Sequence, residues 1–227
     1  MLSEALLVID LQNDFCPDGA LAVAGGDTIV QPINAAMDKF NIVVLTQDWH
    51  PNEHKSFASS HENKRPFDIV EMPYGDQVLW PDHCIQGSMG ARFHPDLNHK
   101  RADVIIRKGS NPAVDSYSAF YENDKVTPTG LHGYLKNREV TKLTLVGLAT
   151  DYCVAFSALD AEKLGYDVTV RLDMARGIDS DGSLNAALDK MSKAVVNLVN
   201  GGYSHQGLEP QMEDRPNCAI PNRYRFL

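Results

Sequence analysis

Residues 143–159 read LTLVGLATDYCVAFSAL, and within them the hydrophobic pattern changes from that of a strand to that of a helix. This change decides the fold. The apolar run at 143–146 is typical of a buried strand, and the spacing at 154–164 is typical of a helix. Cys153 therefore lies at a strand-to-helix junction, where unpaired backbone N–H groups and the positive end of the helix dipole favour a thiolate. This position suits a nucleophile, and a small buried thiol is the alternative interpretation.

Similar apolar, β-branched runs occur on both sides of this junction, separated by helical patterns or long loops. The predicted strands are residues 5–9, 42–46, 104–106, 143–146 and 168–172, and residues 196–199 form either a sixth strand or a helix continuation. The predicted helices are residues 28–40, 131–138, 154–164 and 183–195. This alternation predicts an α/β fold with an open, doubly wound, mainly parallel five- or six-stranded sheet and helices on both faces.

Two stretches interrupt the alternation. Residues 50–102 are rich in His, Pro and Asn, and we expect a loop region at about 47–102 that builds a site. Residues 203–227 contain three prolines and form either an arm that packs on a neighbouring subunit, in a homo-oligomer, or a loose tail. The length of 227 residues predicts one domain over 1–227.

The composition is that of a globular protein, and it argues against nucleic-acid and membrane partners. Hydrophobic residues make up 43% and charged residues 22%, as in ordinary globular proteins. The net charge of −9 without a basic run argues against a nucleic-acid partner. No signal peptide or membrane-length apolar run is visible, so we expect a cytoplasmic protein with no membrane partner. The four cysteines lack close pairing, which favours reduced thiols.

Polar residues with complementary chemistry follow three of the predicted strands. Asp10 follows the strand at 5–9, Lys108 follows the strand at 104–106, and Cys153 follows the strand at 143–146. In an open parallel sheet the carboxyl ends of the strands form the ligand site. A thiol with a pKa of about 8.5 is only slightly ionised at pH 7, so a carboxylate and an ammonium beside it would make it a competent nucleophile.

A second cluster follows the strand at 42–46. Asp48 and His50 are two residues apart, so in extended backbone they project to the same side and can bind one ion. His83 offers a third ligand. This set of donors suits one divalent metal ion, whether zinc, iron or manganese. The competing histidines are His54, His61, His94, His99 and His132.

Several ordered motifs together resemble one family. Residues 8–15 (VIDLQNDF), 107–109 (RKG) and 147–154 (GLATDYCV) are similar to the three catalytic segments of the isochorismatase-like cysteine hydrolases. The motifs DWHP at 48–51, SFA at 56–58 and WPDHC at 80–84 narrow the resemblance to the nicotinamidases within that family. It covers roughly residues 5–200, and it implies the isochorismatase-like hydrolase fold.

The resemblance implies an activity and roles for the triad. The family converts nicotinamide to nicotinate and ammonia through a thioester, also accepts pyrazinamide, and serves NAD salvage. Carried onto this sequence, Asp10 is the general base, Cys153 is the nucleophile, and Lys108 keeps the two in register. The backbone N–H groups of Ala149 and Cys153 bind the oxyanion, and the peptide bond between Leu148 and Ala149 is cis.

The resemblance also implies how the small-molecule substrate is held. A metal ion on Asp48, His50 and His83 binds the pyridine nitrogen. Ser56 stands where the family often has a further ligand or a water-holding group. The aromatic residues that flank the substrate ring in this family correspond to Phe15, Trp80 and Tyr117.

Two departures from the family pattern affect the shape of the pocket. Tyr152 stands where some members have histidine, and the loop at 110–116 is longer than in shorter relatives. Two alternative functions stay open. One is an amidase of the same fold for another small amide or ureido compound, and the other is a non-catalytic binding or redox module with Cys153 as its sensor thiol.

Overall fold

Six strands form one sheet in the computed structural model, which describes residues 3–201 of the chain. Their spatial order is β5 (Val104–Lys108), β2 (Ile42–Asp48), β1 (Ser3–Ile9), β6 (Val140–Leu148), β7 (Asp167–Arg176) and β8 (Asn197–Val199). Every neighbouring pair is parallel. The predicted parallel α/β sheet is confirmed, and residues 196–199 contribute a strand rather than extending a helix. The predicted C-terminal arm at 203–227 lies outside the described residues.

The strand order reverses beside β1. The chain first steps outward from β1 through β2 to β5, and it then returns to place β6 on the other side of β1. In sheets of this kind the ligand binds where the order reverses, beyond the carboxyl ends of the strands. Asp10 leaves β1 and Cys153 follows β6, so both residues flank this point.

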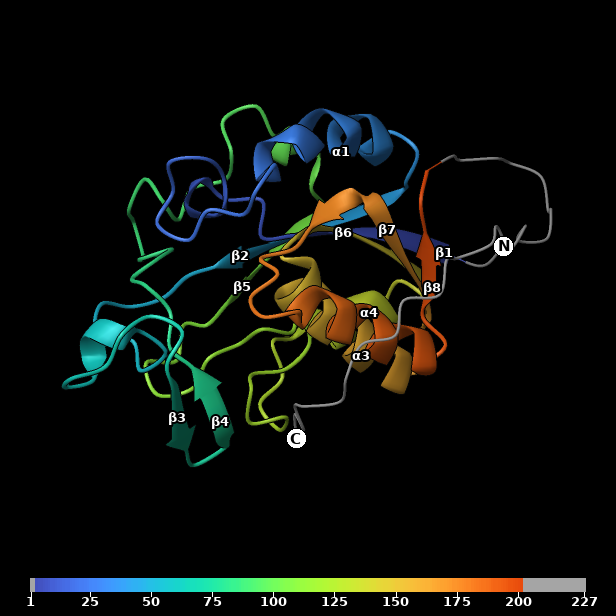
Figure 1. The fold of residues 1–227 in the computed structure, drawn as a ribbon. Coiled ribbons are helices and arrows are strands. Elements are labelled where there is room, and N and C mark those ends of the chain that lie inside the picture. Colours follow the sequence, from blue (N-terminus) through green and yellow to red (C-terminus); the bar gives the residue numbers. More distant parts are fainter. Residues whose placement is uncertain (1–2, 202–227) are drawn as a thin grey trace, which may run out of the picture.

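Helices cover both faces of the sheet (Figure 1). Helix α1 (Val30–Met37) lies on one face, and α3 (Ala155–Lys163) and α4 (Ser183–Lys193) lie on the other. The short helix α2 (Leu131–Lys136) packs into the same apolar cluster as α3. Alternate residues of β1 point to opposite faces, as a strand requires. Among residues 3–201, no helix combines the length and the apolar character needed to cross a bilayer.

Some element boundaries differ from the sequence-based prediction. The helix expected at 28–40 begins with a 3-10 turn at Gly26–Ile29 and ends at Met37. The strand expected at 104–106 continues to Lys108, which is therefore the last residue of β5 and not a loop residue. The α-helix after β6 starts at Ala155, because a π-helical turn over Thr150–Val154 precedes it.

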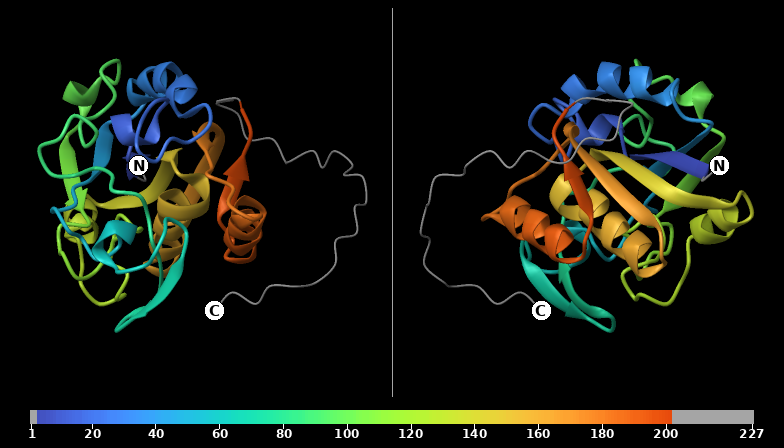
Figure 2. Two further views of the ribbon diagram at one scale, coloured as in Figure 1. Left: turned by 60° about the vertical axis from the view of Figure 1, so that its left-hand side comes forward. Right: turned by 90° about the vertical axis from the view of Figure 1, so that its right-hand side faces the viewer.

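The segment at 50–102 contains regular structure that the prediction missed. Strands β3 (Ile69–Met72) and β4 (Gly75–Val78) form an antiparallel hairpin, which projects from the body of the molecule (Figure 2). Each strand has only four residues and is largely exposed, so the sequence lacks the sustained alternation that identifies a strand. Further 3-10 turns lie at Asn13–Phe15, Ala58–Ser60 and His99–Arg101.

Candidate active site

Cys153 is held by a tight turn after β6. The Leu148–Ala149 peptide bond is cis, as the family resemblance implies. The π-helical turn then begins at Thr150 and places Cys153, which is buried, above the end of the sheet. The Ser157 hydroxyl donates a hydrogen bond of 2.6 Å to the Cys153 carbonyl and ties the turn to α3.

A glycine allows β6 to approach β1 closely just before this turn. Gly147 has φ +113°, and a Cβ there would collide with the carbonyl oxygen of Ile9. Only glycine fits this conformation and this spacing without strain. The close approach brings the Cys153 turn beside Asp10, which follows Ile9.

Lys108 joins the polar groups at the end of the sheet. Its Nζ lies 2.8 Å from Asp10 Oδ2 and 2.5 Å from Asp48 Oδ1. The same nitrogen lies 3.4 Å from Cys153 Sγ and donates to the Ser116 carbonyl at 2.8 Å. Burial opposes the charge, but the two carboxylates raise the pKa of Lys108 well above its ordinary value. Lys108 is therefore an ammonium throughout the working pH range.

Asp10 is oriented by β2 as well as by Lys108. Its backbone N–H donates to Thr46 Oγ1 at 3.1 Å, and that hydroxyl donates to Asp10 Oδ1 at 2.6 Å. Burial raises the pKa of Asp10 to about 6, since desolvation and the charge of Asp48 together outweigh the attraction of Lys108. At neutral pH the carboxylate is mostly ionised and can accept a proton.

Cys153 is a thiol rather than a thiolate at rest. Burial raises its pKa well above the ordinary value, and the carboxylates of Asp10 and Asp48 add to that effect against the opposing charge of Lys108. Full burial thus outweighs the favourable end of the helix dipole, and the thiol needs a base to take its proton. A carboxylate oxygen of Asp10 lies within 4.8 Å of Sγ, so the proton has a nearby acceptor.

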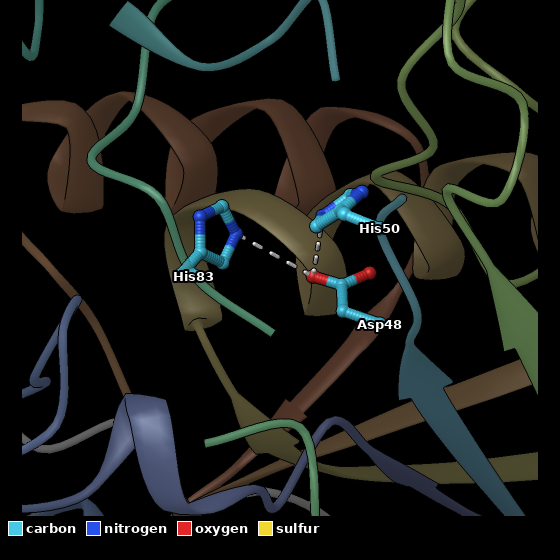
Figure 3. Close-up of side chains that lie close together, drawn as sticks. All are labelled: Asp48, His50 and His83. Atoms are coloured by element: carbon cyan, nitrogen blue, oxygen red, sulfur yellow. Dashed lines mark ion pairs between the residues drawn. The ribbon is translucent and has the colours of Figure 1, made fainter. Parts of the chain in front are cut away.

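Asp48, His50 and His83 converge on one point, as the spacing predicts (Figure 3). Asp48 Oδ2 lies 3.7 Å from His50 Nε2 and 4.0 Å from His83 Nε2. His50 Nδ1 donates to the Gly109 carbonyl at 2.9 Å, and His83 Nδ1 donates to the Pro81 carbonyl at 2.8 Å. Because each Nδ1 is turned toward a backbone carbonyl, each Nε2 faces the Asp48 carboxylate.

This arrangement of donors fits a metal ion. Two imidazole nitrogens and one carboxylate oxygen lie within 4.8 Å of one another. The backbone carbonyls fix the tautomer and the orientation of both rings, as is usual for metal-binding histidines. Gly109 contributes as well, because a Cβ at that position would collide with the His50 ring. The three residues thus form a possible metal-binding site.

The other histidines are placed differently. The His54 ring lies 4.6 Å from the His50 ring, and with Asp115 the two histidines form a second possible group of ligands. Ser56 is committed to His54, since its hydroxyl lies 2.7 Å from His54 Nδ1. Within residues 3–201, the following histidines belong to no group that could hold a metal: His61, His94, His99 and His132.

A pocket opens beside both polar clusters. The three aromatic residues that the sequence similarity assigned to the substrate, Phe15, Trp80 and Tyr117, all line it. Ala149 and Cys153 also line it. Further lining residues are Leu21, Asp48, His50, His83, Asp115, Tyr152 and Ile178. The Trp80 and Tyr152 rings meet edge to face at 4.8 Å, so Tyr152 shapes the pocket directly.

Three lining residues carry no signal in the sequence: Leu21, Asp115 and Ile178. Asp115 is buried in the long loop after β5, where no strand end or recognisable spacing marks it. Ile178 follows β7 and is held through Asp151, whose carboxylate accepts the N–H groups of Ile178 and Asp179 at 2.9 and 2.8 Å. Asp151 also accepts the Ser183 hydroxyl. Asp151 therefore stabilises this loop, and its carboxylate is already occupied by these three donors.

An open parallel sheet that presents a thiol, a carboxylate and an ammonium where its strand order reverses defines a class of cysteine hydrolases. Residues 4–201 match the family model described as the isochorismatase domain. The chain belongs to the isochorismatase family.

Within this family, the chain is similar to proteins named as nicotinamidases and pyrazinamidases. The chain is 50% identical over 196 residues to a nicotinamidase of Acinetobacter baylyi, covering 86% of this chain and 92% of that protein. A solved nicotinamidase and pyrazinamidase of Acinetobacter baumanii is 52% identical with a TM-score of 0.87, covering 88% and 97%. A pyrazinamidase of Pyrococcus horikoshii, solved in complex with zinc, is 35% identical with a TM-score of 0.71, covering 88% and 99%.

Proposed function

We propose that the protein is a metal-dependent cysteine amidohydrolase that converts nicotinamide to nicotinate and ammonia and also accepts pyrazinamide. The observation that carries the proposal is the position of Asp48, which contacts Lys108 through one oxygen and faces His50 and His83 through the other. A thiol and a site for a ring nitrogen thus lie beside one pocket. The names of the relatives support this substrate, and we place the enzyme in cytoplasmic NAD salvage.

The first half of the reaction forms a thioester. Asp10 takes the proton of Cys153, and the sulfur attacks the carboxamide carbon. The backbone N–H groups of Ala149 and Cys153 stabilise the resulting oxyanion. Asp10 then returns its proton to the amide nitrogen, the C–N bond breaks, and ammonia leaves. Lys108 stays protonated throughout and offsets the negative charge that moves between Asp10 and the sulfur.

The second half releases the acid. Asp10, again ionised, takes a proton from a water molecule, and the hydroxide attacks the thioester carbon. When this intermediate collapses, the C–S bond breaks and the sulfur recovers its proton from Asp10. Nicotinate leaves, and the resting thiol is restored.

Asp48, His50 and His83 would hold a divalent ion, which supplies a Lewis acid for the pyridine nitrogen. Phe15, Trp80 and Tyr117 present apolar ring surfaces to a flat heteroaromatic substrate. Together these contacts would orient the ring and direct its carboxamide toward Cys153.

An ammonia-release assay tests the proposal. The purified protein is given nicotinamide, pyrazinamide and a set of ureido compounds, before and after treatment with a chelator and after addition of zinc, iron(II) or manganese(II). We expect turnover of the two pyridine-type amides that falls on chelation and returns with metal. Turnover of ureido compounds alone would identify a different amidase, and the absence of any turnover would favour a binding or redox module.

A further inference from the structure

Gln77 is a buried amide in an otherwise exposed hairpin. The other residues of β3 and β4 are exposed or half-buried, whereas Gln77 has no exposed surface. A polar side chain is buried at a cost unless its hydrogen bonds are made. The contacts of Gln77 therefore identify what holds the hairpin against the body of the protein.

Both ends of the Gln77 amide are hydrogen-bonded. Its Nε2 lies within hydrogen-bond distance of three acceptors: the Val78 carbonyl at 2.7 Å, the Tyr117 hydroxyl at 2.8 Å and Asp115 Oδ2 at 3.1 Å. Its Oε1 accepts from the Tyr74 hydroxyl at 3.1 Å and from Asn123 Nδ2 at 3.2 Å. One side chain on β4 thus joins the hairpin to the loop that follows β5.

The loop residues that Gln77 contacts lie beside the reactive groups. Tyr117 lines the pocket, and the carbonyl of its neighbour Ser116 accepts a hydrogen bond of 2.8 Å from Lys108 Nζ. Asn123 completes the connection, since its Oδ1 accepts the Tyr117 N–H at 3.0 Å. The segment at 115–117 therefore supplies Tyr117 to the aromatic wall of the pocket, and it also accepts a hydrogen bond from the Lys108 ammonium.

The Asp115 carboxylate makes this segment dependent on Gln77. Asp115 is buried, and its oxygens accept one hydrogen bond from Gln77 and one of 2.7 Å from the Ser116 N–H. A buried charge that loses a donor must recover one or move toward water. Loss of the Gln77 amide would remove the two hydrogen bonds that it donates to Asp115 and Tyr117. It would accordingly also displace the segment at 115–117.

We propose that Gln77 is a positioning residue that fixes the segment at 115–117 and thereby the Tyr117 wall against which the substrate ring binds. The inference rests on the proposed function for its substrate. The hairpin, although remote from the thiol, is then part of the structure that determines affinity for the ring.

Two measurements on Gln77→Met test this, with Asp76→Asn as the matched control. Asp76 is the exposed neighbour of Gln77 on the same strand. Hydrogen–deuterium exchange should accelerate at the amides of Ser116, Tyr117 and Asn123 but not in β1 or β6. The KM for nicotinamide should rise about three- to tenfold, with kcat changed less than about threefold, because roughly one hydrogen bond's free energy is lost from substrate binding.

Gln77→Glu provides a second variant. It keeps acceptors for Tyr74 and Asn123 but places a second carboxylate beside Asp115, so its KM should rise further than that of Gln77→Met. Unchanged exchange in the loop, or an unchanged KM despite faster exchange, would overturn the inference. If the parent protein fails to hydrolyse nicotinamide, the proposed function fails, and exchange in the loop then decides whether Gln77 positions it.

Discussion

The reaction cluster (Asp10, Lys108 and Cys153) and the ring-holding cluster (Asp48, His50 and His83) lie side by side but differ in how charge is balanced. In the reaction cluster a single ammonium contacts Asp10, Cys153 and also Asp48. In the ring-holding cluster an anionic oxygen faces two imidazole nitrogens. Burial and the neighbouring His50 lower the pKa of His83 to about 4, so at neutral pH this ring is an electron-pair donor.

The difference indicates that the two clusters depend on different partners. The reaction cluster carries its own cation in Lys108, so its thiol chemistry is complete without an added ion. The ring-holding cluster gathers donor atoms and would take its cation from solution. Variants should therefore separate the chemical step from the binding of the ring, even though Asp48 contacts both sets of residues.

The largest expected effect follows removal of the nucleophile. Cys153→Ala should lower kcat by about 10⁴-fold or more, because losing a nucleophile costs nearly the full contribution of a catalytic set. Nicotinate binding and metal content should be retained, which calorimetry and elemental analysis would show. Loss of the metal together with the thiol would contradict the independence of the two clusters.

Asp10→Asn tests the other end of the reaction cluster. General-base catalysis contributes about 10²- to 10⁴-fold, so kcat for ammonia release should fall by that factor. The Lys108 ammonium would keep its contact with Asp48, and the fold should be preserved, as far-UV circular dichroism would verify. Retention of full activity would exclude Asp10 as the base.

His83→Ala probes the ring-holding cluster by itself. Losing one ligand should weaken metal binding by about 10- to 100-fold or more, as changes around metal sites typically do, and should raise the KM for nicotinamide. The rate at which iodoacetamide alkylates Cys153 should stay near that of the parent, since His83 makes no contact with Lys108. A parallel fall in alkylation would mean that the clusters act as one unit.

The pH profile depends on the reaction cluster. With a pKa of about 6 for Asp10, kcat/KM should be maximal above that value and fall as the carboxylate is protonated. At one pH unit below the pKa, activity should drop about tenfold, because kcat/KM follows the ionised fraction of the base. A profile that stays flat down to pH 5 would require another base.

Tyr117→Phe should give the smallest effect. The change leaves the Gln77 amide and the Trp80 indole N–H without their shared acceptor. Unfolding in urea should show a loss of about 1–2 kcal/mol, the usual cost of unpaired buried donors. The KM should change by only a few-fold, while metal affinity should stay unchanged.

The sequence predicted the site residues that stand at the ends of regular strands. Asp10, Asp48 and Lys108 each stand at the end of an apolar run, and parallel strands bring such ends to one edge whatever their separation in the chain. Cys153 was found in the same way. Family motifs added the cis peptide bond and the aromatic lining, which hydrophobic periodicity does not encode.

The remainder depends on long-range packing. Asp115, Ile178 and Gln77 come from loops or a short hairpin whose positions are fixed by hydrogen bonds between distant segments. No local pattern describes such bonds. The raised pKa of Cys153 has no local signal for a related reason, because it depends on burial and on two carboxylates from other strands.

The position of Lys108 on β5 has a consequence for inactivation. Strand β5 is at the edge of the sheet and pairs with β2, whereas Asp10 and Cys153 are attached to the central strands β1 and β6. Edge strands open at a lower free energy than central ones. Fraying of β5 would withdraw the shared cation while the sheet stayed folded, leaving two buried carboxylates and a thiol unbalanced. On heating, activity should therefore be lost at a lower temperature than the one at which the whole protein unfolds.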